Sequence, residues 1–177
     1  MDSNEILAKL TADEARVRAS LLAPGVSGRS ELAQRSGHAF LEAITSGELP
    51  PAPIGALLGF LLVESSPGRV VFQGTPGYAH YNPIGTVHGG YAATLLDSCV
   101  GCAIHSMLPA GKGYTTLELK INYMRALTDK VGPVRAEGKV IHVGGQIGVA
   151  EGRLTDVHGK IYASATTTCL IFPLPPT

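Results

Sequence analysis

The chain has 177 residues, 45% of them hydrophobic, which allows one globular domain with a substantial core. Its 14 basic and 14 acidic residues give a formal net charge of zero, so we expect no nucleic-acid partner and no anionic membrane. The longest apolar run, residues 54–63, is too short to span a bilayer, and residues 1–10 lack the apolar core of a signal peptide. These features predict a soluble, cytoplasmic protein.

The three cysteines do not form a disulfide framework, because their number is odd. Cys99 and Cys102 spell C-V-G-C, a spacing that also occurs in redox and zinc sites. No second Cys or His pair has the spacing of a zinc site, and the two thiols fall within an apolar stretch. We therefore expect both to be small core residues and expect no metal site.

The first third of the chain predicts an N-terminal helical extension. Apolar residues recur at helical spacing over residues 4–22, and a second short helix is expected over residues 36–46. Residues 47–53, GELPPAP, contain three prolines and predict a linker. We therefore divide the chain into an extension with its linker, residues 1–50, and a main domain, residues 51–177.

The main domain predicts an α+β fold with six strands and one central helix. The helix is expected over residues 91–104, and because it is apolar or small on nearly every side, it should be enclosed by protein. The strands are expected over residues 57–64, 69–74, 114–123, 134–143, 147–155 and 160–172. This order predicts an antiparallel sheet wrapped around the helix, and its uncovered edge favours a dimer.

Asp97 is the only acidic or basic side chain between Gly89 and Ile104. Burying an unpaired carboxylate costs several kcal/mol, so an apolar helix should carry one only for a reason. The residue could act in catalysis, form a salt bridge at a subunit contact, or face solvent where the helix emerges. The sequence leaves these alternatives open.

His88, Gly89 and Gly90 directly precede this helix, whose N-terminus presents free N–H groups and a positive dipole end. Such donors can polarise a carbonyl and hold an oxyanion, although the three residues could also form only an entry turn. Gly89 and Asp97 are eight residues apart, or ~12 Å along a helix at 1.5 Å per residue. They could therefore cooperate only across two antiparallel subunits, which predicts an obligate dimer with two equivalent sites.

The combined motif resembles a known family. Residues 82–90, NPIGTVHGG, are followed by an acid nine residues after the histidine, and residues 113–123 read GYTTLELKINY. This pattern is similar to that of the hotdog-fold acyl-CoA thioesterases of the phenylacetic-acid-degradation (PaaI) type, over roughly residues 54–172. The resemblance implies a hotdog fold, hydrolysis of a coenzyme A thioester, no cofactor beyond the substrate's own CoA, and a homodimer that pairs into a tetramer.

The resemblance also implies roles for individual residues. The Gly89 N–H would polarise the thioester carbonyl, and Asp97 would act as nucleophile or general base. Asn82 would contact the thioester or leaving group, and Thr116 would orient the water. His88 would be mainly structural. The residues expected to border the substrate at the dimer interface are His88, Gly90, Tyr91 and Leu95.

Two of these assignments have plain alternatives. Strict alternation groups Thr116 with Glu118 and Lys120 on the polar face of its strand, where it could be an ordinary surface threonine. The residues that would hold the CoA phosphates are also open, with Arg125, Lys130 and Arg135 as candidates.

Two other functions remain possible at this point. A hotdog hydratase or dehydratase would pair His88 of one subunit with Asp97 of the other as acid and base. A non-catalytic acyl-CoA-binding module would use the same groove without hydrolysis.

Overall fold

The computed structural model describes residues 2–175, and four helices form its N-terminal part. They are α1 (Ser3–Ser20), α2 (Arg29–Gln34), α3 (Gly37–Thr45) and α4 (Pro53–Leu58). The predicted helices over residues 4–22 and 36–46 correspond to α1 and α3, whereas α2 and α4 were not expected. None of the helices in residues 2–175 is both long enough and apolar enough to cross a membrane.

Helix α4 corrects the predicted start of the first strand. Residues 57 and 58 were assigned to a strand but belong to α4, and the strand begins at Phe60. Pro53 suits the first turn of a helix, where its missing N–H costs nothing. Gly59 ends the helix in the left-handed conformation, with φ of 68°, which glycine adopts without strain.

The remaining elements follow the predicted order of two strands, one helix and four strands. They are β1 (Phe60–Ser66), β2 (Arg69–Gly74), a single 3₁₀ turn η1 (Tyr78–His80), α5 (Gly89–His105), β3 (Lys112–Tyr123), β4 (Val134–Val143), β5 (Ile147–Asp156) and β6 (Ile161–Pro173). The strands form one antiparallel sheet in the order β1-β2-β4-β5-β6-β3.

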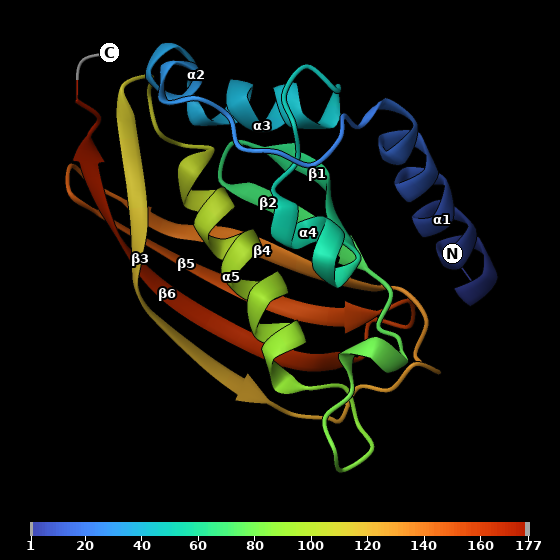
Figure 1. The fold of residues 1–177 in the computed structure, drawn as a ribbon. Helices are drawn as coiled ribbons and strands as arrows, with labels where there is room; N and C mark the ends of the chain where they lie inside the picture. Colours follow the sequence, from blue (N-terminus) through green and yellow to red (C-terminus); the bar gives the residue numbers. More distant parts are fainter. Residues whose placement is uncertain (1, 176–177) are drawn as a thin grey trace.

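Helix α5 lies against one face of this sheet, which curves around it as predicted (Figure 1). Its side chains Leu95, Leu96, Val100 and Ile104 are fully buried and form the centre of the core. A Cβ at Gly138 on β4 would lie 2.3 Å from the Cys99 carbonyl oxygen, so glycine allows the helix to approach the sheet. The predicted α+β fold is confirmed.

The N-terminal extension is fastened to this core by both apolar and polar contacts. Val17 of α1 packs against buried valine and leucine side chains of β1 and β2. Beside them the fully buried Gln73 donates to the Leu10 carbonyl and to the Glu14 carboxylate. Arg135 of β4 pairs with Asp13 of α1 at 2.7 Å. The position of α1 is therefore set by specific contacts with the sheet.

Candidate active site

The start of α5 leaves one backbone donor free. His88 is the N-cap, and its Nδ1 accepts the Gly90 N–H at 2.8 Å. The Tyr91 N–H donates to the His88 carbonyl, whereas the Gly89 N–H has no acceptor among residues 2–175. The helix dipole favours negative charge at this end. Of the two glycines, Gly89 therefore presents a donor to a ligand, and Gly90 does not.

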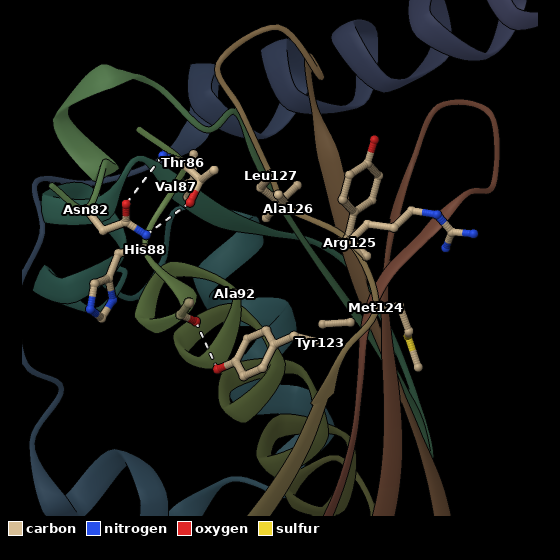
Figure 2. A pocket seen from close by; sticks show the side chains of 13 residues that line it. Asn82, Thr86, Val87, His88, Ala92, Tyr123, Met124, Arg125, Ala126 and Leu127 are labelled. Atoms are coloured by element: carbon tan, nitrogen blue, oxygen red, sulfur yellow. Dashed lines mark hydrogen bonds between the residues drawn. The ribbon is translucent and has the colours of Figure 1, made fainter. Parts of the chain in front are cut away.

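A first cavity of about 360 Å³ lies at this helix start (Figure 2). Tyr123 of β3 closes one side, and its hydroxyl donates to the Gly89 carbonyl at 3.2 Å. Asn82 also borders the cavity, but its side chain is engaged within its own loop. Its Oδ1 accepts the N–H groups of Ile84 and Thr86, and its Nδ2 donates to the Thr86 hydroxyl at 3.0 Å. Asn82 thus holds the loop that leads into α5.

Asp97 lies two turns further along α5 and is exposed to solvent. The Thr116 hydroxyl of β3 donates to its Oδ1 at 3.1 Å. This contact joins two residues that the resemblance assigns to one active site, and their roles there stay predictions. Asp97 faces solvent, as one of its three alternatives expected. In this chain Asp97 has no salt-bridge partner among the described residues, and Thr116 is not a surface threonine that points away from the helix.

A β-bulge explains why simple alternation misplaced Thr116. Thr116 pairs with Cys169 and Glu118 pairs with Thr168, so Leu117 is the extra residue on β3. An extra residue reverses the facing of the side chains before it relative to those after it. Thr116 therefore faces α5, while Glu118 and Lys120 are exposed. The predicted grouping of Thr116 with those two residues was wrong.

Asp97 and Thr116 border a second cavity of about 590 Å³. It lies between the core and the N-terminal extension, and most of its lining is apolar. The two cavities have no lining residue in common. Within one chain, Gly89 and Asp97 thus open into separate spaces, in agreement with their separation along the helix.

Two predicted substrate contacts are core residues instead. Tyr91 and Leu95 are 3% and 0% exposed, and neither lines either cavity. Tyr91 stacks on His80 with ring centroids 4.5 Å apart, and burial raises the pKa of its hydroxyl. An apolar helix with no polar side gives no indication of which residues face a cavity, so the sequence could not separate these two from the true lining.

The second cavity includes one residue that the sequence did not single out, His105, and one that was expected in the core, Cys102. His105 and Cys102, both on α5, line the second cavity. His105 is 5% exposed and packs between the rings of Phe40 and Tyr114, and burial lowers its pKa to about 4. Burial raises the pKa of the Cys102 thiol to about 11, the opposite of a reactive thiolate. No spacing in the sequence marks these contacts.

The candidate phosphate-binding residues differ in availability. Arg135 donates to Gln73, Glu64 and Asp13, so each of its three guanidinium nitrogens is engaged within the fold. Arg125 is exposed and borders the first cavity, and Lys130 is exposed. In residues 2–175 no group of three or more His, Cys, Asp or Glu side chains could hold a metal ion.

Comparison with known proteins adds a family to this geometry. Residues 84–163, which include α5 and the strands β3 to β5, match the model of the thioesterase superfamily. This segment is similar to the thioesterase superfamily. A curated candidate esterase of Halobacterium salinarum is 41% identical over 69 residues, which cover 38% of this chain and 44% of that protein. The chain thus matches less than half the length of this relative.

Solved structures agree on the hotdog fold of the domain. A candidate thioesterase of Ralstonia eutropha, related to phenylacetic acid degradation, is 25% identical with a TM-score of 0.67, covering 73% of this chain and 98% of that one. A PaaI variant of Thermus thermophilus is 25% identical with a TM-score of 0.60, covering 67% and 97%. A Streptococcus mutans protein solved with acetyl-CoA is 26% identical with a TM-score of 0.60, covering 67% and 92%. The resemblance to PaaI-type thioesterases is confirmed.

Proposed function

We propose that the protein is an acyl-CoA thioesterase that hydrolyses a coenzyme A thioester to a carboxylate and free CoA. The observation that carries this proposal is the Asp97–Thr116 pair, an exposed carboxylate oriented by a hydroxyl at the edge of an apolar cavity. The unoccupied Gly89 N–H supplies the second requirement, a donor for the thioester oxygen. The thioesterase superfamily match and the acetyl-CoA complex of the Streptococcus mutans relative support the substrate class.

The site is assembled from two subunits of a homodimer. Gly89 and Asp97 are ~12 Å apart along one helix, whereas reacting groups must meet within ~3–3.5 Å. Two antiparallel copies of α5 would bring Gly89 of one subunit to Asp97 of the other, twice in each dimer. Strand β3 is at the edge of the sheet and carries Thr116, so it offers an unpaired edge for this contact. A tetramer would pair two such dimers.

The chemistry follows from these positions. Thr116 holds Oδ1 of Asp97, which leaves the other carboxylate oxygen to attack the carbonyl carbon or to take a proton from attacking water. The carbonyl oxygen gains negative charge and accepts the Gly89 N–H of the second subunit. The carbon–sulfur bond then breaks, and the CoA thiolate leaves and takes up a proton. If Asp97 is the nucleophile, this step leaves a mixed anhydride with Asp97, and water then hydrolyses it to release the carboxylic acid and restore the carboxylate. We propose that Arg125 and Lys130 hold the CoA phosphates. We also propose that the protein is located in the cytoplasm.

Mixed dimers test both the residues and the assembly. Gly89→Pro removes the N–H, and proline is accepted at the first position of a helix. The preceding residue, His88, already has the extended backbone that precedes a proline, with φ of −59° and ψ of 136°. Gly89→Ala is the matched control, because it adds the Cβ against the Tyr123 ring but keeps the N–H.

Thioester hydrolysis would be measured for each variant alone and for a purified mixed dimer of Asp97→Asn with Gly89→Pro. If each site combines Gly89 of one subunit with Asp97 of the other, one of the two sites in this mixed dimer keeps both residues intact, so about half of wild-type activity returns. If the mixed dimer is as inactive as the two parent dimers, the trans site is contradicted. Hydration of crotonyl-CoA without thioester hydrolysis would indicate the hydratase instead.

A further inference from the structure

The second cavity has two walls of different origin. One wall comes from the hotdog core and includes Asp97 and Thr116. The other comes from the N-terminal extension and from α4, which directly follows it. Its residues include Val26 in the loop after α1, Leu32 of α2, Phe40 and Ile44 of α3, and Ile54 of α4. All five of these residues lie outside the segment that matches the thioesterase superfamily. The space beside the carboxylate is therefore closed by a part of the chain that the superfamily match does not include.

The cavity is suited to an uncharged, apolar group. Its volume of about 590 Å³ is roughly four times the ~150 Å³ that holds a benzene molecule in an apolar protein cavity. Apart from Ser27, the side chains that the extension contributes to the wall are aliphatic or aromatic, and none is a lysine or arginine. The one charged residue of the lining, Asp97, lies on the wall opposite the extension, where the reacting carbonyl would be.

We propose that the N-terminal extension forms the acyl chamber of this enzyme and selects apolar acyl groups much larger than acetyl. This inference rests on the proposed thioesterase function, because it places the thioester carbonyl at Asp97. The acyl chain then extends from Asp97 towards α3 and α4. Each methylene buried on the way contributes about 0.8 kcal/mol, so kcat/KM rises about fourfold per carbon until the chamber is full.

Helix α4 offers a matched pair of variants. Ile54 lines the cavity and is 47% exposed, whereas Leu57 on the same helix is 80% exposed and lines no part of it. Ile54→Trp would place a larger ring in the chamber and reduce its volume, and Leu57→Trp adds the same ring outside it. Val26→Trp is a second filling variant from a different segment, at a position that is 88% exposed and thus tolerant of a larger side chain.

The ratio of kcat/KM for octanoyl-CoA to that for acetyl-CoA would be measured for all four proteins. We expect the wild-type ratio to be at least a hundred, Ile54→Trp and Val26→Trp to lower it at least tenfold, and Leu57→Trp to leave it within twofold. Unchanged ratios in both filling variants would overturn the inference and leave the proposed function standing. A changed oligomeric mass with an unchanged ratio would overturn it too, by identifying the cavity as a subunit contact.

A binding measurement separates this inference from the proposed function. If the wild-type protein hydrolyses neither thioester, the proposed function fails, and calorimetry with the non-hydrolysable thioether S-octyl-CoA then decides about the chamber. Binding weakened at least tenfold by Ile54→Trp but not by Leu57→Trp would support an acyl chamber without hydrolysis. Equal binding to all four proteins would overturn it.

Discussion

Acid should destabilise the protein through His105, which is buried beside the candidate acyl chamber. Burial lowers the pKa of this histidine from 6.5 to about 4, and both ring nitrogens lack a hydrogen-bond partner among the described residues. The folded state therefore binds the proton less tightly than the unfolded state does. Between pH 6.5 and about 4 the unfolded state carries more protons, so the free energy of unfolding falls as the pH is lowered through this window.

The size of the effect follows from the two pKa values. At pH 7, above both pKa values, the imidazole is mostly neutral in both states, and the residue adds little pH dependence. At pH 5 the unfolded histidine is almost fully protonated while the folded one is mostly neutral. With 1.36 kcal/mol for each pKa unit, this difference lowers the free energy of unfolding by about 2 kcal/mol.

Denaturant titrations at pH 7 and pH 5 would measure this change. His105→Phe keeps a ring between Phe40 and Tyr114 but removes the titrating group, so we expect it to lose about 2 kcal/mol less than the wild type on going to pH 5. His142→Phe, the same substitution at an exposed histidine, should respond to pH as the wild type does. The reasoning is refuted if His105→Phe and the wild type show the same pH dependence.

Three further variants probe the candidate site. Thr116→Val removes the hydroxyl that orients Asp97 and should lower kcat about 10- to 100-fold with a small change in KM. Thr116→Ser keeps a hydroxyl and should restore most of the rate. Equal rates for the two variants would contradict this role. His88→Asn keeps an N-cap and should retain kcat within a few-fold in a thioester assay, whereas a loss of several orders of magnitude would reveal an acid–base histidine. Gly89→Pro should lower kcat about 100- to 1000-fold relative to Gly89→Ala, and comparable rates would show that the N–H is not used.

The elements of the hotdog core could be predicted because their signals are local. Alternation over most of residues 114–123 and apolar runs bounded by turn residues elsewhere indicated the strands. The apolar run over residues 91–104 indicated an enclosed helix, so element order and fold class both followed. The short helix α4 was misread because its residues are as apolar as those of the strand that follows. Only the conformation of Gly59 separates the two, and the sequence letters do not show it.

Only part of the candidate site could be predicted, because some of its features depend on spacing along one helix and others depend on contacts between distant segments. The helical spacing of Gly89 and Asp97 is a matter of geometry, so their separation could be read from residue numbers. The facing of Thr116 depends on a β-bulge at Leu117, which no residue type there indicates. The chamber wall comes from contacts between the extension and the core, which are distant in sequence. Tyr91 and Leu95 were misplaced because burial depends on the sheet that packs against them.

The central claim is that Asp97 carries out thioester hydrolysis, and Asp97→Asn tests it most directly. The amide keeps the shape of the side chain but can neither attack the carbonyl nor accept a proton from water. Release of free CoA from octanoyl-CoA would be followed for the wild type and the variant, with denaturant titration to show that the variant is folded. We predict hydrolysis by the wild type and a loss of at least a thousandfold in kcat for a folded Asp97→Asn. Hydrolysis by the variant at the wild-type rate would contradict the account.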